Sequence, residues 1–249
     1  MQGKKLKLFG VLNLTPDSFS DGGNFCDYNA AISHARILAN SCYAIDIGPQ
    51  STRPNAKIIN AEQEISRICN IVKEVSHFAK TSIDSFHFQT QKTAVQQGVS
   101  YINDVTGFVD EQIFHYAPQN IKFIFMHNLG VPPVKTNVLH GEDIEVVAKI
   151  KAWGLEKLRY FEGLGVKSER FIFDIGIGFG KTAEQSLFLI ENIEKFADFP
   201  TPIMVGHSRK SFMELIKPNA SMDERDVITQ RLTISMYSKG CEYFRVHKV

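Results

Sequence analysis

Residues 171–176 read FIFDIG, a short apolar run that ends in an aspartate, an isoleucine and a glycine. Seven more short apolar runs recur along the chain, and helical patterns separate them. Strands that alternate with helices form βαβ units, in which a parallel sheet is buried on both faces. Eight such strands in 249 residues favour an α/β fold of the (β/α)8 barrel type over an open doubly wound sheet. The other runs are LFGVLN (8–13), YAIDIG (43–48), TSIDS (81–85), YINDV (101–105), KFIFMH (122–127), PIMVGH (202–207) and YFRVH (243–247).

Two of the segments between these runs have the periodicity of helices. Apolar side chains recur at helical spacing in residues 61–79, and residues 142–165 show a second pattern that ends in glycines, as helices commonly do. No linker, low-complexity tract or repeat divides the chain, so we expect residues 1–249 to form one domain. A barrel of this kind has a helix after its eighth strand. Because the sequence stops at Val249, we expect this final outer helix to be missing.

Composition and charge exclude several classes of protein. The formal net charge is +1 and no stretch is dense in Lys or Arg, so the chain lacks the basic footprint of nucleic-acid binding. No apolar run approaches the roughly 20 residues that span a bilayer, and we expect no membrane insertion. The four cysteines lie far apart without a C-x-x-C pair, which is typical of reduced thiols. We therefore expect a cytoplasmic protein without disulfides or a zinc site.

Polar residues stand at or just past the C-terminal end of every predicted strand. In a (β/α)8 barrel these ends converge on one face, where active sites are built. A single polar residue there is commonly a helix cap or a turn former, but eight together indicate a site. Burying the carboxylates among them costs free energy unless they are paired or hydrogen-bonded. The residues are Asn13, Asp46, Asp84, Asn103, His127, Asp174, the run His207–Lys210, Arg245 and His247.

Basic residues follow the seventh strand and end the eighth, which favours an anion site. Ser208, Arg209 and Lys210 are expected to begin a helix, and Arg245 and His247 end the last strand. Loops after the seventh and eighth strands of such barrels often hold phosphate, and a helix N-terminus adds to the positive field. Arg209 or Lys210 taken alone would equally fit a solvated surface charge.

The acidic and amide residues suit a flat heterocycle. Asp84, Asn103 and Asp174 with a nearby lysine offer alternating donors and acceptors, and a carboxylate can pair with two N–H groups of an amidine-like edge in one plane. The carbonyl oxygen of Asn13 suits a hard cation such as Mg²⁺, which prefers a few protein oxygens together with phosphate and water. Together these groups predict a heterocyclic substrate activated by pyrophosphate, whose loss leaves an electrophile for a second substrate.

The glycine-rich stretch GIGFGKT (176–182) looks like a phosphate loop, but isoleucine stands at position 175 where the motif needs glycine. We expect its glycines to let the backbone approach a ligand beside Asp174. Phe179 in this stretch and Phe19 near the N-terminus lie among glycines and polar residues, which favours stacking on a ligand. The histidines expected on the polar surface are His34, His77, His87, His115 and His140.

Several strand-end motifs together resemble the dihydropteroate synthase family, TIM-barrel enzymes of folate synthesis. The motifs occur in the family's order and the resemblance covers residues 9–249, which makes it specific. It implies the same barrel that the strand pattern predicts. The motifs are NLTPDSFSDGG in the first loop, DIGPQSTRPNA in the second, SIDS, INDVTG, FDIGIGFGKTAEQ, SRKSF and RVH.

The resemblance implies roles for individual residues. Asn13 resembles the family's Mg²⁺ ligand, and Asp21 resembles a first-loop aspartate that helps to support the pterin cation. The implied catalytic residues are Asp21, Asp84, Arg245 and His247. The implied pterin-binding residues are Asp84, Asn103, Met126, Asp174, Phe179 and Lys210. The implied diphosphate-binding residues are Asn13, Arg209, Arg245 and His247, and those for p-aminobenzoate are Phe19, Thr52, Arg53, Pro54 and Ser211.

The implied reaction joins 6-hydroxymethyl-7,8-dihydropterin diphosphate to p-aminobenzoate and gives 7,8-dihydropteroate and diphosphate. Mg²⁺ is the implied cofactor, and with Arg245 and His247 it would stabilise the leaving diphosphate. Asp84 and Asp174 would favour the charge of the pterin-methyl cation, while the first two loops close over the arylamine and exclude water. The resemblance further implies a sulfonamide target and a homodimer, or a fusion to another folate-pathway enzyme.

Three features depart from the family pattern. Pro49 and Gln50 stand where the family commonly has Gly-Glu, Lys248 stands where it has Asp, and no sequence for a final helix follows. These departures leave open a non-catalytic pterin-binding paralogue. A pterin-dependent methyltransferase barrel is a second alternative, but it would lack the SRK and TPDSFSDGG motifs that this chain contains.

Overall fold

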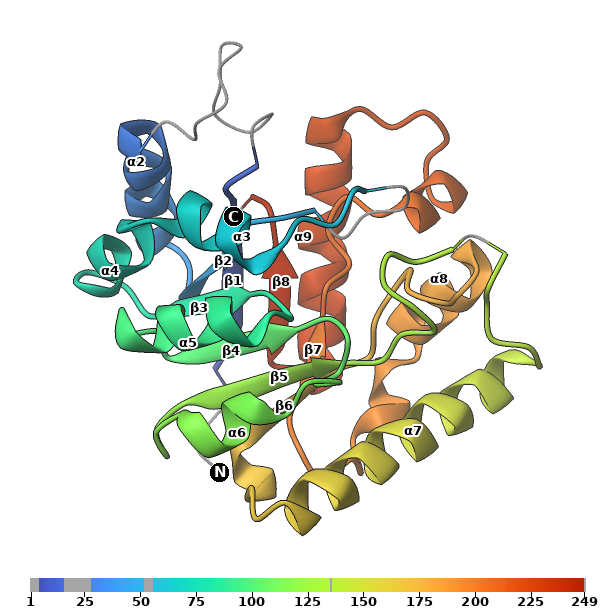
Figure 1. Ribbon diagram of the computed structural model, residues 1–249. Coiled ribbons are helices and arrows are strands. Elements are labelled where there is room, and N and C mark those ends of the chain that lie inside the picture. Colours follow the sequence, from blue (N-terminus) through green and yellow to red (C-terminus); the bar gives the residue numbers. More distant parts are fainter. Residues whose placement is uncertain (1–4, 16–27, 52–55, 135, 249) are drawn as a thin grey trace.

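The computed structural model describes residues 5–15, 28–51, 56–134 and 136–248. In these residues eight parallel strands close into a barrel, in which each strand pairs with the next and β8 pairs with β1 (Figure 1). The predicted (β/α)8 barrel is therefore confirmed, because every strand coincides with one of the apolar runs. The strands are β1 (Lys7–Asn13), β2 (Ala44–Gly48), β3 (Thr81–Asp84), β4 (Tyr101–Asp104), β5 (Lys122–Met126), β6 (Phe171–Asp174), β7 (Ile203–Val205) and β8 (Tyr243–Val246).

Helices lie outside the ring of strands (Figure 1). The longest, α7 (Asp143–Gly163), is the predicted helix of residues 142–165, and Gly165 after it has the positive φ of 81° that favours glycine. The other α-helices are α2 (Tyr28–Ala39), α3 (Ala61–Ile68), α4 (Ile71–Ser76), α5 (Phe88–Gln96), α6 (Gln112–Tyr116), α8 (Ala183–Glu191) and α9 (Met222–Ser238). The 3-10 helices are η1 (Ser168–Arg170), η2 (Ile193–Phe196) and η3 (Ser211–Leu215).

The helix predicted over residues 61–79 is broken into two. A capping box between Asn60 and Gln63 starts α3, because each side chain accepts a hydrogen bond from the other residue's backbone N–H. Cys69 then adopts φ 39°, which no right-handed helix accommodates, and α4 begins two residues later. Ile68, Val72 and Val75 are buried on both sides of the break, so the apolar periodicity continues across it.

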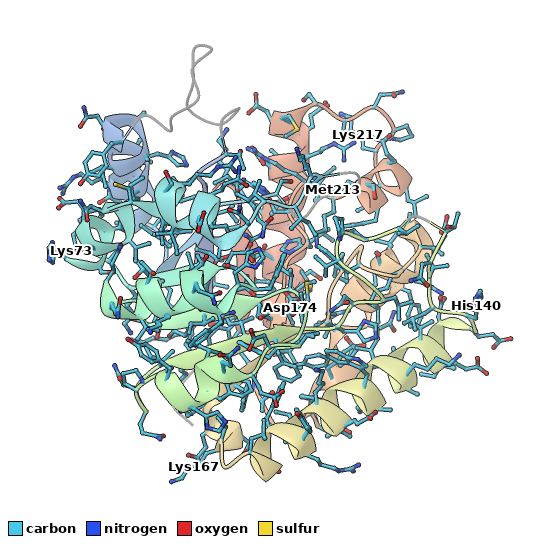
Figure 2. The ribbon with its side chains drawn as sticks, in the orientation of Figure 1. Lys73, His140, Lys167, Asp174, Met213 and Lys217 are labelled. Carbon is cyan, nitrogen blue, oxygen red and sulfur yellow. The ribbon has the colours of Figure 1, made fainter. Side chains whose placement is uncertain are left out.

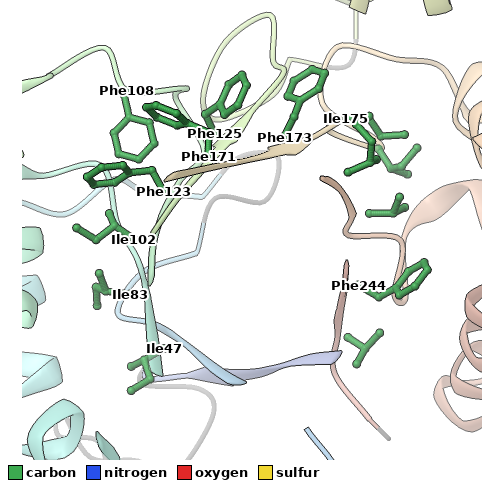
Figure 3. Packing of buried hydrophobic residues seen from close by; sticks show 14 of the residues in the cluster. Ile47, Ile83, Ile102, Phe108, Phe123, Phe125, Phe171, Phe173, Ile175 and Phe244 are labelled. Atoms are coloured by element: carbon green, nitrogen blue, oxygen red, sulfur yellow. The ribbon is translucent and has the colours of Figure 1, made fainter. Parts of the chain in front are cut away.

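Alternation of side chains along the strands gives the barrel an inner and an outer core. Phe9, Ile124, Ile172 and Met204 belong to the cluster that fills the interior. Their neighbours along the strands point outward and pack under the helices, as Figure 3 shows for Ile83, Ile102 and Phe173. Inward residues of such barrels form packed layers, so the inner core is solid rather than a pore. The alternation also decides which strand-end residues can reach a site at the mouth.

Hydrogen-bonded tyrosines and lysines close the end of the barrel where the strands begin. The Tyr101 hydroxyl donates to the Tyr43 hydroxyl at 3.2 Å, and the Lys80 ammonium donates to Tyr43 at 3.1 Å. On the other side the Lys7 ammonium donates to the Tyr243 hydroxyl at 2.9 Å. This end is stabilising structure, and the groups that could bind a ligand lie at the opposite end.

Two sequence expectations concern the outside of the barrel. Among the described residues, those after β8 are His247 and Lys248, and they form no helix. None of the helices in the described ranges has the length and apolar character needed to span a membrane.

Candidate active site

Strand alternation brings six of the predicted residues together inside the C-terminal end of the barrel. Asn103 on β4 lies opposite Asp84 on β3 in the sheet register, and Met126 on β5 lies opposite Asp174 on β6. Asp174 lies near the middle of the molecule in Figure 2. The other two residues are Asp46 on β2 and Arg245 on β8. All of them except Arg245 are buried, with Arg245 partly exposed.

The Arg245 guanidinium joins two of these carboxylates. Its Nε donates to Asp46 Oδ2 at 2.5 Å, and its Nη2 donates to Asp84 Oδ2 at 2.6 Å. Asn103 Nδ2 also donates to Asp46 Oδ2, at 3.2 Å. The second oxygens, Asp46 Oδ1 and Asp84 Oδ1, have no hydrogen-bond partner among the described residues. In the described part of the chain, each aspartate therefore has one buried oxygen without a hydrogen-bond partner, and the two carboxylates share one cation.

Burial moves the pKa values of several site residues toward neutrality. It raises the pKa of Asp84 to about 7, although the Arg245 cation acts in the opposite direction. Burial also raises the pKa of Asp174, while the Lys210 ammonium and the Gly176 N–H lower it. The pKa of Lys210 falls to about 8, mainly because burial disfavours the charged form. Groups perturbed in this way and gathered in one place are characteristic of functional sites.

Asp174, Lys210 and Arg245 converge around Gly206, the residue that follows β7. A Cβ atom at Gly206 would lie 3.6 Å from Asp174 Oδ2, 3.7 Å from Arg245 Cβ and 4.0 Å from Lys210 Nζ. The Lys210 ammonium lies 4.9 Å from the centroid of the Phe179 ring. A carboxylate, two cations and an aromatic ring thus border one region, and glycine at position 206 adds no side chain to it.

The expected helix start at Ser208 is wrong. Residues 208–210 form a turn in which Arg209 has φ 60°, a left-handed value that a helix cannot continue, and the five-residue helix η3 begins only at Ser211. The Arg209 guanidinium donates to both oxygens of Asp226 on α9, at 2.7 and 2.8 Å. This pairing turns Arg209 toward α9, so its predicted contact with diphosphate stays a prediction.

His247 lies beside the same turn. Its ring Nδ1 is 3.1 Å from the Ser208 hydroxyl oxygen, and its backbone N–H donates to that oxygen at 3.3 Å. Lys248, which stands where the family has Asp, forms an ion pair with Asp223 on α9 at 3.1 Å. The His247 contacts join the end of the last strand to the turn after β7, and the anion site predicted there stays a prediction.

Asn13 supplies the oxygen that would suit a hard cation. A Cβ atom at Gly48 would lie 3.3 Å from Asn13 Oδ1 and 3.8 Å from Asp84 Oδ2, so these two oxygens border the same small space. Within the described ranges, no group of three or more His, Cys, Asp or Glu side chains could hold a metal ion. Because Asp84 Oδ2 already accepts from Arg245, Asn13 Oδ1 is the oxygen left for a cation here, and such a cation would take its remaining ligands from phosphate and water, as Mg²⁺ does.

Five of the predicted residues lie outside the described residues. They are Phe19, Asp21, Thr52, Arg53 and Pro54. Ser211 is described: it is exposed and begins η3, directly after Lys210.

The base of the second loop is held by residues that the sequence reading did not assign. The Ile59 N–H donates to Gln50 Oε1 at 3.3 Å, and the Ile59 carbonyl oxygen lies 2.9 Å from His87 Nε2. Arg67 on α3 donates to the Pro49 carbonyl oxygen at 2.8 Å. His87 was expected on the polar surface, but it tethers the end of this loop. Pro49 and Gln50, which depart from the family pattern, both take part in the tether.

Two strand-end histidines do not reach the mouth of the barrel. His127 and His207 each follow an inward-facing residue by one position, so both turn outward. The Nδ1 atom of His127 bonds the Lys181 ammonium at 2.9 Å, and Nε2 of His207 lies 3.1 Å from the Thr229 carbonyl oxygen on α9. Their inclusion among the converging polar residues is wrong.

Comparisons with known proteins agree with this geometry. Residues 9–247 match the family described as pterin binding enzyme. The chain is 36% identical to a dihydropteroate synthase of Clostridium beijerinckii, with 99% of this chain and 90% of that protein covered. It is 32% identical to a folate synthesis bifunctional protein of Arabidopsis thaliana, where 99% of this chain covers 54% of the relative.

A solved structure gives the same result in three dimensions. The dihydropteroate synthase of Anaplasma phagocytophilum, crystallised with bound 6-hydroxymethylpterin-monophosphate, superposes with a TM-score of 0.88. The two chains are 33% identical, and the match covers 98% of this chain and 94% of that one. The chain belongs to the pterin binding enzyme family and, within it, to the dihydropteroate synthases.

Proposed function

We propose that this protein is a transferase of folate synthesis that joins 6-hydroxymethyl-7,8-dihydropterin diphosphate to p-aminobenzoate. The observation that carries the proposal is the convergence of Asp174, Lys210 and Arg245 around Gly206, with Asp84 bound to the same Arg245. Such a site can bind a flat, donor-rich heterocycle at one end and an anion at the other. The names of the relatives and the pterin ligand of the Anaplasma structure support the same assignment.

The pterin ring would lie inside the barrel mouth formed by the C-terminal ends of the strands. The Asp174 carboxylate accepts hydrogen bonds from the amidine-like edge of the ring, and the Lys210 ammonium donates to its acceptor atoms. Asn103 and Asp84 complete the polar edge, while Met126 and Phe179 contact the faces of the ring. Because carboxylates surround the ring, positive charge that develops on it as the leaving group departs is stabilised.

The diphosphate would lie toward the turn after β7. Arg245 and His247 approach it from β8, and Arg209 lies in the adjoining turn. Cations in this position stabilise the negative charge that collects on the departing diphosphate. Asn13 would hold Mg²⁺, whose contribution when bound is to neutralise part of that charge.

The arylamine would bind at the outer end of the site. Ser211 is exposed beside Lys210, and the family resemblance adds Phe19, Thr52, Arg53 and Pro54 from the two loops. Asp21 of the first loop would support the cation from the same side. In this step the protein acts mainly by positioning: it holds the neutral amine in line with the electrophile and away from water.

We propose further that the protein acts in the cytoplasm as a homodimer, or as part of a fusion like the bifunctional relatives. Sulfonamides, which are arylamines of similar shape, would compete with p-aminobenzoate. Gel filtration with light scattering would determine the number of chains in the assembly.

Product formation tests the proposed function. With Mg²⁺, the pterin diphosphate and p-aminobenzoate, the purified chain should form dihydropteroate and release one diphosphate per product. Binding of the pterin diphosphate without product would identify the non-catalytic paralogue instead. If methyl transfer to a corrinoid occurred with no arylamine product, the methyltransferase alternative would hold.

The hydrogen bonds that hold the base of the second loop predict an effect on the KM for p-aminobenzoate alone. In His87→Ala the Ile59 carbonyl oxygen loses its donor, and a single hydrogen bond contributes about 0.5–1.5 kcal/mol, so the KM for p-aminobenzoate should rise about 2- to 12-fold. The KM for the pterin diphosphate should stay within about twofold. Steady-state kinetics on His87→Ala and on the exposed control His115→Ala measure both constants, and an equal rise in the two would contradict a role confined to the loop.

A further inference from the structure

Lys181 ends the glycine-rich stretch that resembles a phosphate loop, and its ammonium group is buried. The residue is 6% exposed. Its Nζ lies 2.9 Å from His127 Nδ1, 2.8 Å from the Gly176 carbonyl oxygen and 3.0 Å from the Phe179 carbonyl oxygen. An ammonium group has three donors and no acceptor, so these three acceptors satisfy it completely.

The same contacts fix the state of His127. With Lys181 protonated, Nδ1 of His127 accepts and the ring proton resides on Nε2, although burial lowers the pKa of Lys181 itself well below its usual value. Burial, aided by the Lys181 cation, lowers the pKa of His127 to about 3, so the ring is neutral at physiological pH. The ring also packs against Trp153 on α7, with 5.1 Å between the ring centroids. His127 is thus a rigid acceptor held between Lys181 and the helix layer.

Lys181 and Lys210 bind the glycine-rich stretch at different carbonyl groups. Lys181 donates to the carbonyl oxygens of Gly176 and Phe179, and Lys210 donates to that of Ile177. The stretch can present these carbonyl oxygens because Gly176, Gly178 and Gly180 adopt φ values of 67°, 77° and 67°.

The stretch is also connected to Asp174, where the pterin edge would bind. The Gly176 N–H donates to Asp174 Oδ1 at 2.8 Å. The positive charge of Lys181 lowers the pKa of Asp174, in addition to the effects of Lys210 and Arg245. Lys181 therefore supports both the position and the charge of Asp174 from behind the site.

We propose that Lys181, with His127 as its acceptor, is a positioning residue for the pterin half of the site. It acts through the backbone conformation of residues 175–180. That conformation positions the side chains of Asp174 and Phe179, and it places the Ile177 carbonyl oxygen to which Lys210 donates. The inference rests on the proposed function, since it names a further residue needed to bind the same substrate. The proposal predicts weaker binding of the pterin diphosphate and an unchanged KM for the arylamine.

Two pairs of variants test the proposal. Lys181→Met keeps the length of the side chain and removes the donors, and Lys151→Met is the matched control on α7, where the ammonium pairs with the exposed Asp198. His127→Leu removes the acceptor, whereas His127→Asn keeps an acceptor oxygen near the place of Nδ1. The fluorescence of Trp153, the single tryptophan, checks that the packing beside His127 is retained.

The expected result is a loss confined to the pterin. In Lys181→Met and His127→Leu the Kd and the KM for the pterin diphosphate should rise about 10- to 100-fold, as expected for the loss of one to two charge-assisted hydrogen bonds. The KM for p-aminobenzoate should stay within about threefold, and His127→Asn and Lys151→Met should behave like the unchanged protein. If Lys181→Met does not fold, the two His127 variants decide the question.

Two outcomes would overturn the proposal. One is unchanged pterin affinity in a folded His127→Leu or Lys181→Met variant. The other is an equal rise in the constants for both substrates, which would indicate a general structural role. Pterin binding is measured by calorimetry without turnover, so a catalytically silent chain still tests the inference. An unchanged chain that binds no pterin diphosphate would instead refute the proposed function.

Discussion

Asp174→Asn should lower kcat/KM for the pterin diphosphate by about 100- to 10,000-fold. The carboxylate would accept two hydrogen bonds from the pterin edge, and bonds to a charged group contribute about 1.5–3 kcal/mol each. Asparagine keeps the shape but offers one acceptor and one donor, so one N–H of the pterin would face another donor. Steady-state kinetics at saturating p-aminobenzoate measure the loss, and a change below tenfold would mean that Asp174 does not bind the pterin.

Asp104→Asn is the matched control for this substitution. Asp104 is also a buried aspartate at a strand end, but it follows the inward-facing Asn103 and turns toward the helices. Its carboxylate accepts from the Thr106 N–H at 2.8 Å, from the Thr106 hydroxyl at 2.6 Å and from Gln91 Nε2 at 3.1 Å. Its replacement should lower stability and leave kcat/KM within about threefold. Comparison of the two variants separates burial from substrate contact.

Arg245→Met should lower the free energy of unfolding by about 3–5 kcal/mol at pH 8, because it leaves the buried carboxylates of Asp46 and Asp84 without their cation. The loss should be smaller at pH 5.5. The pKa of Asp84 in the folded protein is about 7, above the ~3.9 of an unfolded chain, so its ionisation opposes folding as the pH rises between these values. Removing Arg245 raises that pKa further, and below neutrality Asp84 can take up a proton instead.

Urea unfolding at the two pH values measures this effect. Arg231→Met on α9 is the control, since Arg231 is exposed and forms no ion pair with any described residue; its substitution should change stability by at most about 0.5 kcal/mol at either pH. A loss for Arg245→Met that is equal at pH 8 and pH 5.5 would contradict the electrostatic explanation and point to lost packing.

The barrel and the inward residues could be predicted because both follow from short-range patterns. A strand buried on both faces is a continuous apolar run, and the polar residue that ends it lies at the mouth by topology. Asp84, Asn103 and Asp174 are therefore found from sequence. His127 and His207 were assigned wrongly because one further position along a strand reverses the direction of the side chain.

The remaining site features depend on contacts between distant parts of the chain. Lys181 bonds His127, which is 54 residues away in the sequence. Arg209 pairs with Asp226 on α9, the helix that follows the turn containing Arg209. Neither pairing has a periodic signal in the sequence. The break at Cys69 depends on a single backbone angle, and the apolar pattern passes through it unchanged.

The hydrogen-bonded tyrosines and lysines at the beginning of the strands have a consequence for the order of events. Because Phe9 and its neighbours fill that end of the barrel and Tyr43, Tyr101 and Tyr243 cover it, the described residues leave no path to the site from that end. Asp174 is buried and Ser211 is exposed, so we expect a ligand at Asp174 to bind before one at Ser211. We therefore expect ordered binding, in which the pterin diphosphate binds before the arylamine and dihydropteroate leaves through the same mouth of the barrel.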